Sequence, residues 1–161
     1  MTSWGVGPKF AFASLLMLLA LIVVNFYFVP ELSLPFSPLR VFAGVVLIFL
    51  GVAVCVAAAF QVHKAFNQRK LLTSGVFAYV RNPVYAAFIW LIAPAMVLVT
   101  GFLLLVVLPF AMYGLIRVLI VEEDRYLEQR FGQEYIDYKK RVNAVVPSIP
   151  AYHASQKPKV A

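Results

Sequence analysis

Two polar stretches interrupt an otherwise apolar chain, and they carry most of the side chains that could do chemistry. The first, residues 71–85, is a turn-forming junction between two long apolar segments. The second begins at Glu122 and Glu123, where the last apolar segment ends, and continues into residues 131–135. Carboxylate, hydroxyl and amide groups at these places can hydrogen-bond to a polar ligand, which lipid tails cannot do. The two stretches therefore predict one polar site at a membrane surface.

Each of these side chains has a functional interpretation and a simpler one. Glu122 and Glu123 are expected at a helix start, where the helix dipole favours a carboxylate, and could bind ligand hydroxyl or ammonium groups or form a solvated turn. Tyr85 could point into a pocket or belong to the aromatic belt of the membrane interface. Arg81 could hold a ligand carboxylate or anchor the loop to lipid phosphates.

The composition is that of an integral membrane protein. Of the 161 residues, 63% are hydrophobic and 13% are charged, and the mean hydropathy of +0.87 lies far above that of soluble domains. The formal net charge of +7 does not indicate nucleic acid, because the basic residues lie beside apolar segments, where they set topology and meet anionic head groups. We therefore expect membrane lipids as partners, no nucleic acid, and a single domain over residues 1–150.

The sequence contains no familiar metal or dinucleotide motif. A single cysteine, Cys55, excludes an internal disulfide and a multi-cysteine metal site. His63 and His153 lie far apart and have no cysteine pair to join. A Gly-x-Gly-x-x-Gly segment, which soluble folds use to bind dinucleotides, is absent from the sequence. We therefore expect no metal.

The apolar runs predict an all-α, polytopic membrane bundle with about four transmembrane helices. Two uncharged runs are each long enough to cross the hydrocarbon layer of about 30 Å as helices. A third, residues 82–116, is too long for one helix and fits a helical hairpin that turns at Thr100 and Gly101, with Pro94 and Pro109 expected to kink its arms. The predicted spans are residues 10–29, 41–60, 83–99 and 102–121.

A C-terminal amphipathic cytoplasmic helix is predicted over residues 122–142, followed by a flexible tail at residues 151–161. Six of the seven acidic residues lie in this helix, and apolar or aromatic residues recur there every three or four positions. The loop of residues 61–83 is basic and has no acid, which indicates the cytoplasmic side. With an even number of spans, both termini and both polar stretches share that face. We expect the inner membrane of a bacterium.

The order and spacing of these motifs resemble the membrane-embedded methyltransferases related to isoprenylcysteine carboxyl methyltransferase, with the phospholipid methyltransferases as nearby relatives. That family has a Leu-x-Thr-x-Gly-x-Tyr segment, then Arg-His-Pro-x-Tyr, a helical hairpin, a Glu-Glu pair, Phe-Gly-x-x-Tyr-x-x-Tyr and a proline. The corresponding residues here are Leu71–Phe77, Arg81–Tyr85, Glu122–Glu123, Phe131–Tyr138 and Pro147.

The resemblance implies an enzyme that uses S-adenosylmethionine, bound in a cytoplasm-facing pocket, and a lipidic, isoprenoid-like or prenylated acceptor that enters from the bilayer. It implies methylation of a carboxylate oxygen as the reaction. It further implies that Glu123 acts in catalysis as well as in cofactor binding, with Arg117 as the acceptor-binding arginine. The cofactor contacts carried over are Leu71, Leu72, Phe77, Asn82, Pro83, Val84, Tyr85 and Glu123.

Two positions depart from the family pattern. Asn82 stands where the family has histidine, and Phe77 stands at the usual tyrosine. An amide can donate and accept hydrogen bonds but cannot act as a base near neutral pH, so a mechanism that needs an imidazole base at position 82 is excluded. Phe77 can line a pocket but has no hydroxyl with which to hydrogen-bond.

Two other function classes remain compatible with the sequence. One is an NADPH-dependent sterol- or enone-reductase-like enzyme, since some membrane reductases share a similar C-terminal hairpin. The other is a small non-catalytic membrane protein or transporter, although coupled transport usually places an ionisable group within a span and the uncharged runs hold none. Binding of S-adenosylmethionine, of NADPH or of neither would separate the three classes. The oligomeric state is left open.

Overall fold

The structure, a computed structural model, describes residues 6–66 and 70–149, apart from the side chains of residues 65 and 66. Within these residues, four helical segments are long and apolar enough to cross a membrane, which confirms the predicted all-α bundle. The predicted tail at residues 151–161 lies outside the described residues. The four segments are α1 (Gly7–Phe28), α2 (Pro38–Phe66), a first hairpin arm made of α3 (Pro83–Ala87), η3 (Phe88–Ile92) and α4 (Ala93–Thr100), and a second arm made of η4 (Leu103–Val106) and α5 (Val107–Phe131).

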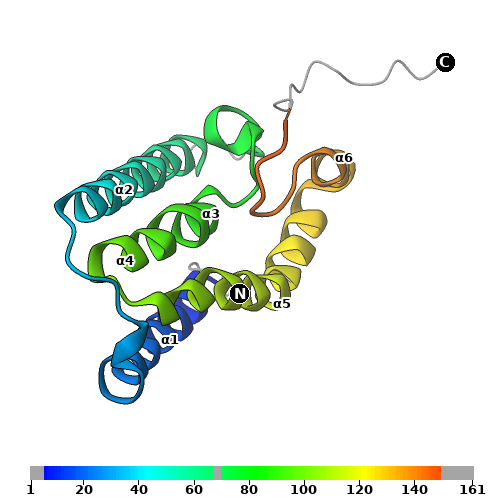
Figure 1. The fold of residues 1–161 in the computed structure, drawn as a ribbon. Helices are drawn as coiled ribbons and strands as arrows, with labels where there is room; N and C mark the ends of the chain where they lie inside the picture. Colours follow the sequence, from blue (N-terminus) through cyan, green and yellow to red (C-terminus); the bar gives the residue numbers. More distant parts are fainter. Residues whose placement is uncertain (1–5, 67–69, 150–161) are drawn as a thin grey trace.

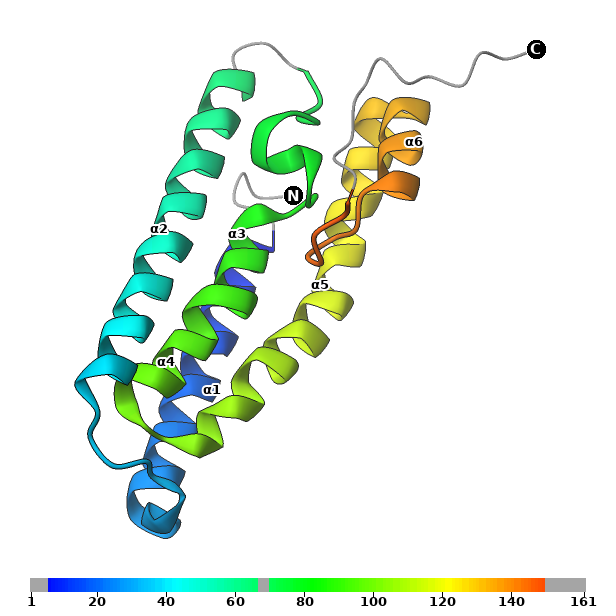
Figure 2. The same cartoon turned by 45° about the horizontal axis from the view of Figure 1, so that its top comes forward.

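The first hairpin arm occupies the middle of the bundle. Figure 1 shows α3 and α4 between α2 on one side and α1 with α5 on the other. The packing follows this order, with α2 against α3, η3 and α4, and α1 against α5 and η4. In Figure 2, η1 (Pro30–Leu32) and the α4–α5 turn lie at one end, while the junction before α3 and the short helix α6 (Gln133–Arg141) lie at the other. The two polar stretches of the sequence therefore share one end of the bundle.

Small residues on α2 let this helix approach the hairpin closely. Gly44, Gly51 and Ala58 follow one another at intervals of seven residues, so they lie on one helix face. A Cβ atom at Gly44 would lie 2.7 Å from Val99 Cγ2, and one at Gly51 would lie 2.7 Å from Ile92 Cγ1. Close van der Waals packing at small residues is a main source of helix association in lipid. The heptad of small residues therefore fixes how α2 docks.

The hairpin turns where the sequence predicts. Gly101 adopts φ 80° and ψ 1°, a left-handed conformation that glycine accepts without steric cost. The Thr100 hydroxyl donates to Met96 O at 2.6 Å and accepts from Phe102 N at 3.2 Å. The Thr100 side chain thus provides hydrogen bonds to backbone groups at the turn, and a short connection is sufficient.

The two prolines of the hairpin act differently. Pro94 is the second residue of α4, just after the π-helical turn η3, whose wider hydrogen-bonded ring gives room for a residue that has no N–H. Pro109 falls in the first turn of α5, where its missing donor has no intrahelical partner to lose. Only the first arm therefore interrupts its regular helix at a proline.

The second polar stretch is organised differently from the prediction. α5 continues without a break past Glu122 and ends only at Gly132, which adopts φ 56° and ψ −132°, and α6 begins after it. The predicted helix over residues 122–142 is therefore wrong at its start, and Glu122 and Glu123 lie inside a helix, away from any N-terminal dipole. The physical reason is that residues 115–131 contain no glycine or proline, and leaving the bilayer breaks no intrahelical hydrogen bond.

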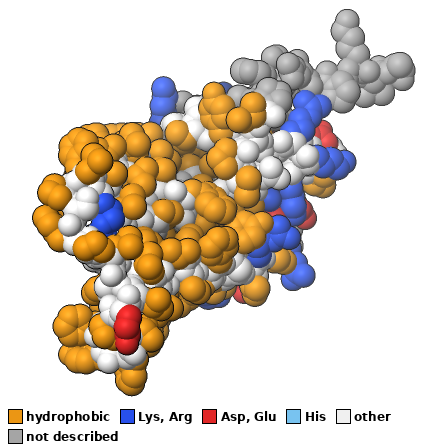
Figure 3. All heavy atoms as spheres, in the orientation of Figure 1, with side chains coloured by type: hydrophobic (Ala, Val, Ile, Leu, Met, Phe, Trp, Pro, Cys, Tyr) orange, Lys and Arg blue, Asp and Glu red, His pale blue; other side chains and the backbone are white. Residues whose placement is uncertain are grey.

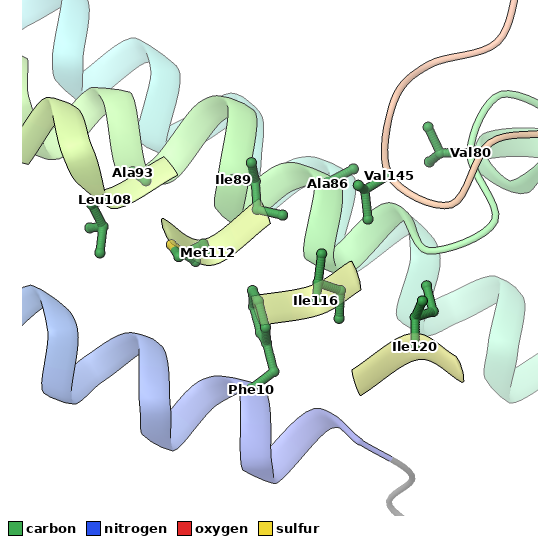
Figure 4. Close-up of a cluster of buried hydrophobic side chains, with 10 residues drawn as sticks. All are labelled: Phe10, Val80, Ala86, Ile89, Ala93, Leu108, Met112, Ile116, Ile120 and Val145. Carbon is green, nitrogen blue, oxygen red and sulfur yellow. The ribbon is translucent and has the colours of Figure 1, made fainter. Parts of the chain in front are cut away.

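The core joins α1, the hairpin and the segment after α6. Figure 4 shows Phe10 of α1 beside Ile116 and Met112 of α5. Val145, from the segment after α6, belongs to the same buried cluster as Val80 of the junction. In Figure 3, hydrophobic side chains cover most of the visible face, and charged side chains gather toward the end that carries α6. The apolar surface suits contact with lipid, and the charged end suits the membrane surface.

Candidate functional site

The polar end of the bundle holds a cavity of about 650 Å³ between the junction, α5 and α6. All the residues predicted as cofactor contacts lie on its wall, although they come from two separate parts of the chain. These residues are Leu71, Leu72, Phe77, Asn82, Pro83, Val84, Tyr85 and Glu123. The two polar stretches thus meet around one space, as a shared site requires. The identity of the ligand stays a prediction at this point.

Sequence reasoning did not assign several other residues of this wall. Tyr126 and Arg130 follow Glu123 at intervals of three and seven positions, so a helix continued through Glu123 would have placed them on its face. No local pattern marks Gly7 at the start of α1 or Val62 near the end of α2 as wall residues. These two reach the cavity only through the packing of the helices.

Glycine and proline shape the junction. Gly75 adopts φ 61° at the start of the 3₁₀ helix η2 (Gly75–Ala78), and the Gln61 side chain lies so close that a Cβ at Gly75 would collide with it. Glycine is the residue that tolerates both conditions. Pro83 occupies the first turn of α3, where its fixed φ suits a helix start. The junction thereby presents the run from Asn82 to Tyr85 to the cavity.

The segment after α6 runs alongside the junction. Arg81 N donates to Asn143 O at 2.9 Å, and Asn82 N donates to Ala144 O at the same distance. The Asn82 side chain also donates to Ala144 O, at 3.3 Å. The amide that stands in place of the family histidine therefore helps to hold the C-terminal segment on the junction.

A buried ion pair joins the junction to α5 and α6. The Arg81 guanidinium lies 2.5 Å from Asp124 Oδ1 and donates to the Tyr135 hydroxyl at 2.7 Å. The Tyr135 hydroxyl donates to Asp124 at 2.5 Å, and Lys139 Nζ lies 2.9 Å from Asp124 Oδ2. Only 8% of the Arg81 side chain and 10% of the Asp124 side chain are exposed. We refer to Arg81, Asp124, Tyr135 and Lys139 as the α6 anchor.

The α6 anchor gives Arg81 a role that neither interpretation from the sequence included. Its Nε donates to Val142 O at 3.0 Å, in addition to its contacts with Asp124 and Tyr135. The guanidinium thus binds three parts of its own chain, and Asp124 balances its charge. Removing one partner of a buried pair leaves an uncompensated charge, at a cost of about 3–5 kcal/mol. Arg81 therefore holds the wall of the cavity together.

Two tyrosines of α6 close one side of the cavity. The Tyr138 hydroxyl donates to Phe77 O at 2.5 Å. Burial and the hydrogen bond to Asp124 raise the pKa of Tyr135 above its ordinary value. A hydrogen bond to Glu128 raises the pKa of Lys139. The folded anchor therefore keeps its tyrosine neutral and its lysine charged.

Glu123 presents a carboxylate with unused hydrogen-bonding capacity. Its Oε2 is buried and accepts no hydrogen bond from the described part of the chain, while the Tyr85 hydroxyl lies close enough to interact electrostatically with the same carboxylate. A buried acceptor without a partner costs about 1–3 kcal/mol, and Glu123 lies on the wall of the larger cavity. The neighbouring Glu122 is instead paired with Lys9 at 3.1 Å on the surface. The structure thus separates the two glutamates of the motif.

A second, apolar cavity of about 260 Å³ adjoins the first. Gly7, Val84 and Tyr85 line both cavities, so Tyr85 stands where they meet. The smaller cavity extends between α1, the hairpin and α5, with Phe10 and Met96 among its walls. These elements belong to the spans, so this cavity lies at membrane depth. A polar cavity beside an apolar one suits a polar ligand that meets a lipid-like one.

Arg117 lies outside this arrangement. It lines neither cavity, and its exposed side chain donates to the Tyr113 hydroxyl at 3.5 Å. α5 turns Ile116 and Ile120 toward the core, and Glu123 continues that face, whereas Arg117 is rotated by about 100° from Ile116. The geometry does not bring Arg117 together with the other predicted site residues.

Comparison with known proteins identifies the family to which the chain belongs. The sequence model of the isoprenylcysteine carboxyl methyltransferase (ICMT) family matches residues 41–129, more than half of the chain. The chain belongs to this family. The matched residues run from α2 through the junction into α5 and include Glu123.

Several relatives carry the name protein-S-isoprenylcysteine O-methyltransferase. The protein of Schizosaccharomyces pombe is 35% identical over 50% of this chain and 34% of its own length. That of Saccharomyces cerevisiae is 31% identical over 53% of this chain and 36% of its own length, and that of Rattus norvegicus is 30% identical over 66% and 41%. The chain thus spans less than half the length of these relatives. No solved structure matches this member of the isoprenylcysteine carboxyl methyltransferase family.

The match to the isoprenylcysteine carboxyl methyltransferase family leaves out two elements that complete the cavities. Gly7 of α1 precedes the matched residues, and Tyr135 and Tyr138 of α6 follow them. Their positions on the wall come from the structure, so in this family member the cavity wall extends beyond residues 41–129, which the family model matches.

Proposed function

We propose that this protein is a membrane methyltransferase that uses S-adenosylmethionine to methylate the carboxylate of a lipid-like acceptor. The observation that supports the proposal most is the convergence of the family motifs around a polar cavity that adjoins an apolar cavity at membrane depth. The names of the relatives favour a prenylated cysteine as the acceptor.

The residues of the larger cavity suit this cofactor. The Glu123 carboxylate, on the wall of this cavity, would accept a hydrogen bond from a ribose hydroxyl or from the cofactor ammonium group. Phe77 and Tyr138 offer aromatic surface against which an adenine can pack. Lys70 and Arg130, on the same wall, would balance the cofactor carboxylate. The charged, polar and aromatic side chains of the wall are therefore suited to the carboxylate, ammonium, ribose and adenine groups of S-adenosylmethionine.

The proposed reaction requires the protein to align the two reacting groups and does not require an acid or a base. When bound, the cofactor would supply a methyl group attached to a positively charged sulfur. The carboxylate oxygen forms a bond to the methyl carbon as the carbon–sulfur bond breaks, and the sulfur keeps the electron pair of that bond. A carboxylate is already a nucleophile, so positioning alone contributes several kcal/mol, up to about 7–11. Tyr85, where the cavities meet and next to Glu123, would orient the reacting ends. An imidazole at position 82 is not needed.

We further propose that the polar end faces the cytoplasm of a bacterium, with both termini on that side of the inner membrane. Lys64 and Lys70 flank the loop before the junction, and basic loops favour the cytoplasmic side. Arg81 adds little to this bias, because Asp124 balances its charge inside the protein.

Ligand titrations in nanodiscs test the proposal. Saturable binding of S-adenosylmethionine, followed by transfer of a labelled methyl group to a prenylated cysteine analogue, is the expected result. Release of the label by mild base would identify a methyl ester. Saturable binding of NADPH in place of S-adenosylmethionine would indicate a reductase, and binding of neither would contradict any such enzymatic role.

A further inference from the structure

The polar and the apolar cavity meet at the start of α1. Among the described residues, Gly7, Val84 and Tyr85 line both cavities. Phe10 follows Gly7 by one helical turn and packs its ring against that of Tyr85, with 4.9 Å between the ring centroids. The beginning of α1 therefore lies directly against the residues of the first hairpin arm at this point. We refer to the region bounded by Gly7, Val84 and Tyr85 as the neck.

Neither backbone conformation nor helix packing requires glycine at position 7. Other glycines of the described chain either adopt positive φ angles or, on α2, leave no room for a Cβ atom. The φ angle of Gly7 is not positive. The described atom nearest to a Cβ at this position would be the Tyr85 hydroxyl oxygen, at 3.7 Å, which is an ordinary van der Waals contact. A methyl group would therefore fit at position 7 without strain.

A side chain larger than alanine at position 7 would fill the neck. The Cβ atom would already be in contact with the Tyr85 hydroxyl, and leucine adds further carbon atoms beyond Cβ, with bonds of about 1.5 Å. These atoms would take space that now belongs to both cavities, because Gly7 is part of both walls. The missing side chain of Gly7 thus leaves the neck open.

Methyl transfer needs the two reacting atoms to come within about 3–3.5 Å of each other. With the cofactor in the larger cavity and the acceptor tail in the smaller one, the neck is the place where both ligands are within reach. Most of the wall of each cavity lies elsewhere, on the junction, α5 and α6 for the larger and on the spans for the smaller. Position 7 can therefore control how the ligands meet without controlling whether each one binds.

We propose that the missing side chain of Gly7 keeps the neck open, so that the acceptor carboxylate reaches the methyl group of the cofactor. The inference rests on the proposed function, because it takes the larger cavity as the cofactor site and the smaller one as the place of the acceptor tail. Gly7 is then a positioning residue, since it supplies no reacting group and its small size sets how closely the ligands approach. A bulky residue at position 7 slows methyl transfer while both ligands still bind.

Gly7→Leu and Gly7→Ala test the inference in nanodiscs. Calorimetry measures the affinity for S-adenosylmethionine and, separately, for a prenylated cysteine analogue whose carboxylate is replaced by an amide, which does not take the methyl group. In Gly7→Leu both affinities should stay within about threefold of the wild type, whereas kcat for the carboxylate analogue should fall by about tenfold to a hundredfold, because small misplacements of reacting groups are that costly. Gly7→Ala should lose no more than about threefold in kcat, because its methyl group fits.

Gly114→Leu is the matched control. It adds the same side chain at a helical glycine that lines neither cavity and has no described neighbour near its Cβ position, so it should leave both affinities and kcat at the wild-type values. Gly7→Val, with a smaller side chain, should show the same separation of binding from turnover to a lesser degree, and thermal unfolding checks that each variant is folded.

Three results would overturn the inference. The first is an undiminished kcat in Gly7→Leu. The second is a loss of cofactor affinity that accounts for the loss of turnover, because position 7 would then belong to the cofactor site. The third is an equal loss of kcat in Gly7→Ala and Gly7→Leu, because the size of the side chain would then not matter.

The wild-type protein separates this inference from the proposed function. Cofactor binding and methyl transfer by the wild type support the proposed function, and the variants alone then decide the role of Gly7. A wild type that binds no S-adenosylmethionine and transfers no methyl group contradicts the proposed function itself, before any variant is compared.

Discussion

Glu122 and Glu123 show how one step along a helix changes what a side chain can do. Glu122 pairs with Lys9 on the surface, where both side chains are more than half exposed and water and salt screen the interaction. Glu123, rotated by about 100° around α5, lines the larger cavity and has a buried oxygen with no hydrogen-bond partner in the described part of the chain. The motif contains both residues, and the orientation of α5 places Glu123, and not Glu122, on the wall of the larger cavity.

Replacing Glu123 with alanine should weaken S-adenosylmethionine binding by tenfold or more, because a hydrogen bond to a charged group contributes about 1.5–3 kcal/mol. Titration in nanodiscs measures the affinity, and circular dichroism checks that the helices persist. Glu122→Gln is the matched control and should bind the cofactor as the wild type does. Equal affinities for Glu123→Ala and the wild type would remove Glu123 from the site.

Among the elements, α2 depends on small residues for its position. Gly51 and Gly44 face the first hairpin arm so closely that a Cβ at either would come within 2.7 Å of a side-chain carbon. Around Gly114 of α5, by contrast, no neighbouring atom of the described residues lies within 4 Å of the place its Cβ would take. The chain therefore offers tightly and loosely packed helical glycines for comparison.

Gly51→Ala should lower stability by about 1–3 kcal/mol, because the added methyl overpacks the contact with Ile92. Gly114→Ala should raise stability by up to about 1 kcal/mol, because alanine favours a helix and meets no neighbour there. Thermal unfolding in detergent compares both with the wild type. A melting temperature of Gly51→Ala equal to or above that of the wild type would contradict close packing at Gly51.

The short helix α6 depends on the α6 anchor to stay folded. It has nine residues, and isolated helices of that length are marginal in water. The anchor residues and the contact of Tyr138 with Phe77 supply what helix propensity does not. The wall of the larger cavity that α6 provides should therefore respond to the protonation of the anchor.

Alkaline pH should release α6 while the spans remain folded. Because folding raises the pKa of Tyr135, its stabilising contribution is complete below the ordinary tyrosine pKa of about 10 and is lost as the pH rises further. The raised pKa of Lys139 acts in the same direction. Spin-label distances between positions 137 and 64 should lengthen above about pH 10.

A phenylalanine in place of Tyr135 cannot ionise, so the distances in Tyr135→Phe should change less steeply with pH. Tyr27→Phe alters an exposed tyrosine near the end of α1 and should reproduce the wild-type profile. A profile that is the same in all three proteins would show that Tyr135 does not control α6.

Across the whole molecule, four spans bring the junction, α6 and the start of α1 to one end (Figure 2). The apolar cavity begins at that end and runs into the spans beside α1. Such an arrangement lets a water-soluble ligand and a lipid-like ligand approach the same point from different phases. It requires that the polar end and the η1 end face opposite sides of the membrane.

Single cysteines introduced into a Cys55→Ala background test this orientation. Ser74→Cys, at the junction, should react with a membrane-impermeant maleimide only from the cytoplasmic side, and Glu31→Cys, in η1, only from the other side. Both positions are exposed, so access depends on the membrane alone. Labelling of both from one side would contradict the four-span topology, and the reverse pattern would invert the proposed orientation.

The spans and the hairpin turn could be predicted because membrane constraints act locally. A backbone in hydrocarbon has to satisfy its own hydrogen bonds, so an uncharged run of sufficient length indicates a crossing helix, and Gly101 marks the turn. The start of the helix predicted at residue 122 was wrong because charge marks the membrane surface without ending a helix. The unbroken helix then places Tyr126 and Arg130 on the cavity wall.

By itself, the sequence determined the number of crossings and the end of the molecule where the motif residues gather, since hydrocarbon thickness and an even count of spans require both. Only the tertiary structure decided that Asp124 balances Arg81, that Arg117 turns away from the cavities, and that the Ser14 hydroxyl has no hydrogen-bond partner among the described residues. Successive residues of an α-helix point in directions about 100° apart around the helix axis. Which side chains meet across tens of residues therefore depends on how all the helices pack together, and no local pattern contains that information.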